Sequence, residues 1–93
     1  MAITRINHFE AKPGAEEKLY AFLQSVIETI RGCEGSLSCR LLRSTESPEK
    51  LAIIEEWESI ESHQAAAKAI PKERMAEAMT LFGKPPSGMY YRE

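Results

Sequence analysis

The residues best suited to chemistry gather around the only tryptophan of the chain, in the segment IIEEWESIESH at positions 53–63. Glu55 and Trp57 have the same parity along an expected strand, so both side chains lie on one face of the sheet. His63 follows on an expected helix. A neutral histidine accepts a proton from an acidic phenol because its pKa lies near the working pH. His63 is therefore a candidate base, and the alternative is a surface or helix-cap histidine.

Asn7 is a second candidate, because asparagine is depleted in strands and a buried polar side chain needs hydrogen-bond partners. It either contacts an oxygen atom of a substrate or satisfies the backbone of a loop. Trp57 is either a core residue or the wall of a pocket. If the first and third strands were parallel neighbours, Asn7 and Trp57 would lie at a similar height and share that wall.

A buried Glu55 needs a cation, and Arg5 and Arg40 are the candidates on strands of the same sheet. A structural ion pair is favoured over an acid–base role for this carboxylate. One of the two tyrosines at positions 90 and 91 should face inward and offer a phenol to a substrate, and parity does not decide which. Met75, Met79 and Phe82 have helical spacing, which favours a place in the core over the lining of an apolar pocket.

Periodicity and turn signals predict strands at 2–10, 36–44, 51–57 and 89–93, and helices at 15–32, 59–70 and 71–82. Ser59 is the expected N-cap of the middle helix, and GKPPSG at 83–88 is expected to end the last one. The order predicts an α+β fold of the ferredoxin-like βαββαβ type, with a four-stranded antiparallel sheet whose first and third strands are central. Ile53 and Ile54 point to opposite faces, so a second copy is expected to cover the open face.

Length and composition limit the alternatives. The 93 residues allow one small domain, 1–93, and the net charge of −2 gives no basic excess for nucleic acid or an anionic membrane. No run approaches the roughly 20 apolar residues of a membrane span, and no signal peptide is evident, so a cytoplasmic location is expected. Cys33 and Cys39 are expected to be plain thiols. The sequence has no P-loop, GxGxxG, zinc spacing or Ser-His-Asp signature.

The chain resembles the antibiotic biosynthesis monooxygenase family. The resemblance rests on FEAKPGAEEKLYAFLQSVIETIRGCEGSLSCRLLRS, on LAIIEEWES and on SHQAAAKAI, and the tail PPSGMYYRE is similar to that of the quinol-monooxygenase-like branch. It implies a dimeric α+β barrel, assembled through the sheet faces, with a pocket between sheet and helices in each subunit. Members of the family oxidise quinols or anthrone-type polyketides with O2 and no cofactor. Others degrade haem or handle small signalling molecules.

The function that the resemblance implies is a cofactor-independent monooxygenase acting on a small electron-rich aromatic or quinol, without a metal. Such an enzyme needs an apolar pocket, a proton acceptor and exclusion of water. The helix pair around Pro71 is a candidate lid. The catalytic candidates are Asn7, Trp57 and His63, and the candidate pocket residues are Arg40, Glu55, Met79, Phe82 and Tyr90.

Two other functions stay open. The first is a dimeric small-molecule binding or stress-response module without turnover. The second, in third place, is haem degradation. Asn7 lies seven residues before Gly14, which matches a pocket asparagine of the haem-degrading branch, but the segment 64–93 has no histidine to serve as the axial ligand.

Overall fold

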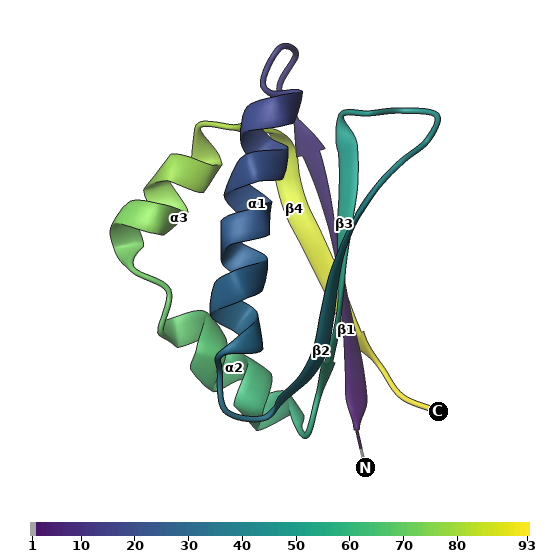
Figure 1. Ribbon diagram of the computed structural model, residues 1–93, viewed down its shortest axis with the longest axis vertical. Coiled ribbons are helices and arrows are strands. Elements are labelled where there is room, and N and C mark those ends of the chain that lie inside the picture. The colour runs from purple at the N-terminus through teal and green to yellow at the C-terminus, as the bar shows by residue number, and fades with distance from the viewer. Residues whose placement is uncertain (1) are drawn as a thin grey trace.

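A computed structural model describes residues 2–93. Its elements follow the order strand, helix, two strands, two helices and strand (Figure 1). They are β1 (Ile3–Ala11), α1 (Glu16–Arg31), β2 (Ser36–Arg43), β3 (Lys50–Trp57), α2 (Ile60–Lys68), α3 (Lys72–Met79) and β4 (Phe82–Tyr91). Among the described residues, no helix has both the length and the apolar character that a membrane crossing requires.

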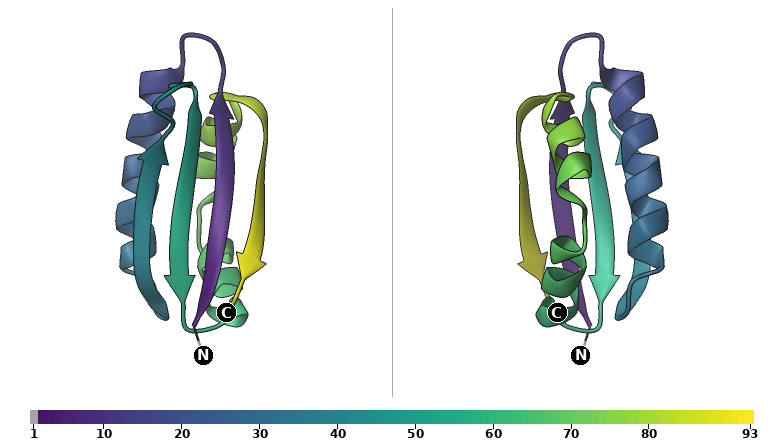
Figure 2. Two further views of the ribbon diagram at one scale, coloured as in Figure 1. Left: turned by 90° about the vertical axis from the view of Figure 1, so that its right-hand side faces the viewer. Right: turned by 90° about the vertical axis from the view of Figure 1, so that its left-hand side faces the viewer.

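The four strands form one antiparallel sheet in the order β2-β3-β1-β4, so β1 and β3 are central as the sequence predicts. All three helices lie on one face of this sheet, and none of the described elements lies on the opposite face (Figures 1 and 2). The predicted ferredoxin-like fold is confirmed. Since β1 and β3 run antiparallel, the conditional prediction that Asn7 and Trp57 share one height is wrong. Trp57 lies opposite Ile3, and Asn7 lies opposite Ile53.

The core forms where the apolar stripe of α1 meets the inner face of β1 and β3. Spacings of three and four residues place one face of α1 against the sheet, and its buried residues are Leu19, Phe22, Leu23, Ile27 and Ile30. Glutamates in the first turn and Arg31 in the last complement the helix dipole. From the sheet, Ile53 and Trp57 fill the core and are among the most completely buried side chains.

Alternation along the strands divides the sheet into two distinct faces. Ile53 faces the helices and is buried, whereas Ile54 faces the open side, as predicted. Apolar side chains lie opposite one another across the strands of the open face. Ile6 lies opposite both Ile54 and Met89, and Leu42 lies opposite Ala52. Met89 is 63% exposed and Leu42 is 40% exposed. Within residues 2–93, no helix or loop covers this face.

The last strand begins earlier than the sequence predicts. GKPPSG does not separate a helix from a short strand but forms the middle of β4, and α3 ends at Met79. Proline lacks the amide that a strand donates, and edge strands tolerate this loss because one of their sides is unpaired. The prolines of β4 accordingly lie on an edge strand, where its register with β1 is irregular.

The predicted helical stripe of Met75, Met79 and Phe82 is wrong. Phe82 lies at the start of β4, and Met75 and Met79 are 52% and 68% exposed. The spacing is helical only up to the end of α3, and α3 turns Ala78 rather than the methionines toward the core. The expectation that these methionines are core residues therefore fails.

Helix α2 is held against the end of the sheet by two local features. Ser59 is the N-cap, and its hydroxyl accepts a hydrogen bond from the amide of Ser62. Gly35 has a φ of +86°, and a Cβ at this position would lie 2.5 Å from the hydroxyl oxygen of Ser62. Only glycine suits both the backbone angle and the close approach. This contact fixes the position of the first turn of α2, which includes His63.

Candidate functional site

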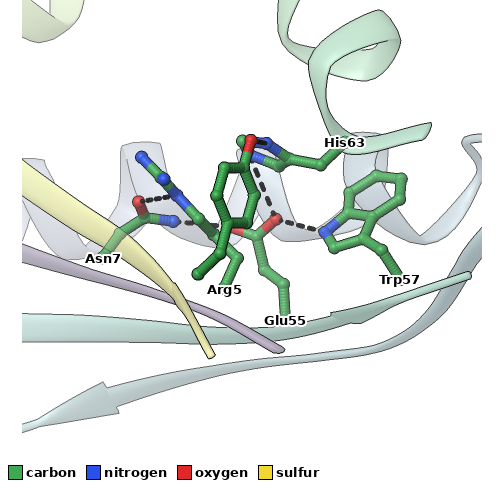
Figure 3. A network of polar contacts seen from close by, with 6 residues as sticks. Arg5, Asn7, Glu55, Trp57 and His63 are labelled. Atoms are coloured by element: carbon green, nitrogen blue, oxygen red, sulfur yellow. Dashed lines mark hydrogen bonds and ion pairs between the residues drawn. The ribbon is translucent and has the colours of Figure 1, made fainter. Parts of the chain in front are cut away.

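Six polar and aromatic side chains form one connected network between the sheet and α2 (Figure 3). Strand register explains how they meet. Arg5 lies opposite Glu55 on one side and Tyr90 on the other, and alternation directs all three toward the helix layer. The other members are Asn7 and Trp57 from the central strands and His63 from α2. The network thus joins β1, β3, β4 and α2.

Glu55 is the centre of this network and is 3% exposed. Its Oε2 accepts a hydrogen bond of 2.7 Å from Asn7 Nδ2, and its Oε1 accepts one of 2.8 Å from Trp57 Nε1. Burial raises the pKa of the Glu55 carboxyl above its ordinary value, while the bond from Trp57, the charge of Arg5 and the bond from Asn7 act in the opposite direction. Each carboxylate oxygen accepts one hydrogen bond and the side chain is buried, so Glu55 links Asn7 and Trp57 within the network.

Trp57 is fully buried, at 0% exposure. Its ring meets the imidazole of His63 edge-on, with ring centroids 5.6 Å apart. The sequence left open whether Trp57 is a core residue or a pocket wall. The structure places it in the core, where its indole N–H holds the carboxylate that organises the network.

His63 and Tyr90 form the closest contact of the network. The hydroxyl oxygen of Tyr90 lies 2.6 Å from Nδ1 of His63, and Nε2 of His63 lies 3.9 Å from Oε1 of Glu55. If the phenol donates to Nδ1, the proton of the neutral imidazole is on Nε2 and faces the carboxylate. The inward tyrosine is Tyr90, and Tyr91 is 48% exposed.

Arg5 borders the network on the side of β4. Its Nε donates to Asn7 Oδ1 over 3.0 Å, and its guanidinium carbon lies 4.7 Å from the centre of the Tyr90 ring. Gly88 lies opposite Asn7 in register, and a Cβ built there would overlap the side chains of both Asn7 and Arg5. Gly88 therefore leaves the space in which these two side chains lie.

The other predicted pocket residues lie elsewhere. Arg40 is opposite Ile54, which puts it on the open face, so the prediction that it pairs with Glu55 is wrong. Met79 is exposed at the end of α3. Phe82 is opposite Ala11, at the other end of β1 from Arg5, and stacks on Phe9 with ring centroids 5.8 Å apart. The network therefore excludes three of the predicted residues. The sequence predicts Arg5 only as a partner for Glu55 and gives no prediction for Gly88.

The cysteines are not part of this chemistry. Cys33 and Cys39 are free thiols. Cys39 lies opposite Glu55 in register, and burial, followed by the nearby carboxylate, raises its pKa to about 12. The thiol is thus neutral at physiological pH, which leaves it without the reactivity of a thiolate. Within residues 2–93, no group of three or more His, Cys, Asp and Glu side chains is arranged to hold a metal ion.

A hollow of about 380 Å³ lies between α1 and α3, apart from the polar network. Its lining includes Phe22, Ser25 and Arg74, and the guanidinium of Arg74 lies over the Phe22 ring. None of the six network residues lines it. The polar network and this surface hollow are therefore separate features.

The titration of His63 gives a testable pH dependence. Burial first, and the charge of Arg5 second, lower its pKa below 6.5 in the folded protein. The folded state then binds the proton less readily than the unfolded chain, so acidification through the unfolded pKa costs stability. Glu55 acts in the opposite sense, since its raised pKa makes stability fall as pH rises above about 4.5.

Replacing His63 with glutamine isolates the contribution of the histidine. Between about pH 7.5 and about pH 5.5, the wild type is expected to lose unfolding free energy relative to His63→Gln. Urea unfolding at both pH values measures this difference. An equal change in the two proteins would contradict the lowered pKa. Exposed His8, on the opposite face, offers the control His8→Gln, which is expected to behave like the wild type.

The fold and this inward-facing network define an α+β domain with a polar site between its sheet and its helices. The sequence profile described as antibiotic biosynthesis monooxygenase matches residues 2–78. The chain belongs to this family. A search of curated proteins finds no match.

Solved structures confirm the fold over the full length. A conserved protein from Methanosarcina mazei Go1 is 23% identical, with a TM-score of 0.89 over 100% of this chain and 93% of that one. Rv0793 from Mycobacterium tuberculosis is 21% identical, with a TM-score of 0.86 over 100% and 95%. SnoaB from Streptomyces nogalater, a cofactor-independent oxygenase, is 16% identical, with a TM-score of 0.84 over 99% and 92%. At these identities the likeness concerns the fold.

Proposed function

We propose that the protein is a cofactor-independent monooxygenase that oxidises a small electron-rich aromatic, such as a quinol, with O2. The observation that carries this proposal is the chain of contacts from Tyr90 through His63 to buried Glu55. Membership of the family and the likeness to the fold of a cofactor-independent oxygenase support the reaction class. The contacts supply the proton acceptor that such a reaction needs.

The proton follows the contacts in order. The hydroxyl oxygen of Tyr90 accepts the proton of the substrate phenol while its own proton passes to Nδ1 of His63 over 2.6 Å. The imidazolium that forms is stabilised by Glu55 at 3.9 Å. Asn7 and Trp57 hold the two carboxylate oxygens in place. The lowered pKa of His63 keeps it neutral and ready to accept.

The deprotonated substrate supplies the electrons. It passes one electron to O2, and the resulting radical pair forms a carbon–oxygen bond to give a peroxide. Cleavage of the O–O bond leaves one oxygen atom on the carbon and releases the other as water. For a hydroquinone, one O2 accepts four electrons and the products are a hydroxyquinone and water, so atoms and electrons balance.

Substrate entry is assigned to the segment of α2 and α3. No residue of α2 is buried, and Ala78 is the buried residue of α3, so the segment is weakly anchored to the sheet. Segments with few buried contacts open at low cost in free energy. Their movement would admit a flat aromatic beside Tyr90 and exclude water on closing.

The proposal includes a homodimer through the open face of the sheet. Replacing Ile54 with arginine puts a charge in the centre of this apolar face and is expected to convert a dimer into a monomer. Sedimentation at micromolar concentration distinguishes the 10.5 kDa monomer from its dimer. The exposed Lys12→Arg variant serves as the control for added bulk. A wild-type protein that sediments as a monomer would contradict this part of the proposal.

Haem degradation fits the site poorly. The Nδ1 atom of His63 contacts Tyr90, and Nε2 faces Glu55. A haem ligand needs a histidine nitrogen free to bind iron. His8, the other histidine, lies opposite Ala52 on the open face.

The proposal is tested by O2 uptake with a panel of substituted hydroquinones, measured against buffer autoxidation. Turnover above autoxidation for at least one compound is expected. Calorimetric binding of the same compounds without any O2 uptake would instead indicate the binding module without turnover. The haem alternative is tested by a haemin titration. We expect no Soret shift, and a shift would favour haem binding.

A further inference from the structure

The guanidinium of Arg5 is fixed in the network but incompletely bonded. Its Nε donates to Asn7 Oδ1, and no hydrogen bond from its two terminal nitrogens to residues 2–93 is present. Figure 3 shows the guanidinium extending past Asn7 and away from Glu55. The terminal nitrogens are therefore available to a partner from outside the chain.

The charge of Arg5 is not neutralised by direct contact. Asn7 lies between Arg5 and Glu55, because its Oδ1 accepts from the arginine while its Nδ2 donates to the carboxylate. Among residues 2–93, no salt bridge joins Arg5 to a carboxylate.

The position of the guanidinium is set from two further sides. The ring of Tyr90 lies 4.7 Å from its carbon atom, which holds the plane by a cation–π contact. The missing side chain at Gly88 leaves room for it above β4. Both features hold the guanidinium beside the ring of Tyr90.

We propose that Arg5 binds the ionised oxygen of the substrate, so that the ligand is a planar aromatic held as an oxyanion beside Tyr90. This inference rests on the proposed function, since it assigns the substrate class of the same site. A guanidinium presents parallel N–H donors that suit an oxyanion, and charge-assisted bonds are shorter and stronger than neutral ones. An ionised phenol, an enol or a carboxylate carries this chemistry.

Two matched pairs of non-oxidisable probes test the assignment by calorimetry. Hydroxynaphthoquinone is ionised at neutral pH and its methyl ether is not, and naphthoate is ionised whereas naphthamide is neutral. The wild type is expected to bind at least one anion about tenfold or more tightly than its neutral partner. Preference in the first pair identifies an enolate or phenolate ligand, and preference in the second identifies a carboxylate.

Variants assign this preference to Arg5. The Arg5→Gln variant is expected to reduce it to about twofold or less. Lys12→Gln makes the same change in net charge at an exposed turn and is expected to retain it in full. The Arg5→Lys variant keeps the charge but loses the paired N–H donors of the guanidinium, so a smaller preference for the anion is expected. If Arg5→Gln does not fold, an undiminished preference in Arg5→Lys overturns the assignment.

The inference is also overturned if anion and neutral partner bind equally, if no probe binds, or if Arg5→Gln retains the preference. These outcomes are separable from the fate of the proposed function. An Arg5-dependent preference without O2 uptake supports this site and contradicts the monooxygenase. Turnover without any dependence on Arg5 supports the monooxygenase and contradicts this site.

Discussion

Replacing Tyr90 with phenylalanine is expected to lower the rate of hydroquinone oxidation by about 10²–10⁴-fold, the usual contribution of a positioned acid–base group. The substitution keeps the ring that stacks on Arg5 and removes only the hydroxyl that contacts His63 at 2.6 Å. The loss should fall on kcat rather than on KM alone, because proton transfer occurs in the reaction and not in ground-state binding. Steady-state O2 uptake measures both constants.

Two further variants make this prediction specific. Tyr91→Phe removes the neighbouring hydroxyl, which points to Met89 instead, and is expected to change the rate little. The double variant Tyr90→Phe/His63→Asn should be about as slow as the slower single variant, because residues that act as one relay are not additive. A Tyr90→Phe enzyme with unchanged kcat would remove the tyrosine from the mechanism. Additive losses in the double variant would show that the two residues act separately.

Replacing Trp57 with alanine is expected to lower the free energy of unfolding by about 3–5 kcal/mol, the range for truncation of a buried tryptophan. Small domains have about 5–15 kcal/mol in total, so the variant would be close to unfolded. The loss has two sources. The fully buried ring leaves a cavity, and Glu55 loses the donor of a 2.8 Å hydrogen bond.

Urea unfolding followed by far-UV circular dichroism measures this loss without needing the tryptophan signal. Trp57→Phe separates the two sources, since it keeps an aromatic ring and removes the indole N–H, and a loss of about 1–3 kcal/mol is expected because the acceptor is a carboxylate. Met79→Ala, at a position 68% exposed, is a control expected to stay within about 0.5 kcal/mol. A loss below about 1 kcal/mol in Trp57→Ala would contradict the core placement.

Parity along single strands accounts for what the sequence predicted well. The period of two put Glu55 with Trp57 on one face and Ile54 on the other, and both placements are confirmed. The cap at Ser59 and the polar segment that follows gave the start of the helix that carries His63. These features are local, so they can be worked out from neighbouring residues alone.

The failures concern register and the ends of elements. The position of Arg40 depends on how β2 pairs with β3, and a shift of one residue reverses the face of the side chain. Helical spacing continued past Met79 in the sequence, while the chain itself changed to a strand at Phe82. Two prolines lie inside β4 because an edge strand tolerates them. Local turn rules instead predict that the chain breaks its regular structure at these prolines.

The role of Arg5 depends on two strands together, β1 and β4. Its contacts combine Asn7 on the same strand, Tyr90 on β4 and the small residue at Gly88. The register of β1 with β4 brings these residues into contact, and no motif in the sequence encodes that register. The glycine in the tail strand, opposite a polar residue of the first strand, is the signal that would have indicated such a close approach.

The central claim is that the protein inserts one atom of O2 into an electron-rich aromatic. Mass spectrometry of the product formed under isotopically labelled O2 tests it most directly, using the hydroquinone that gives the fastest O2 uptake. One labelled oxygen atom in the product and one in water is the predicted result, with formation dependent on Tyr90. A product without label, a product with both labelled atoms, or no product above buffer autoxidation would contradict the account.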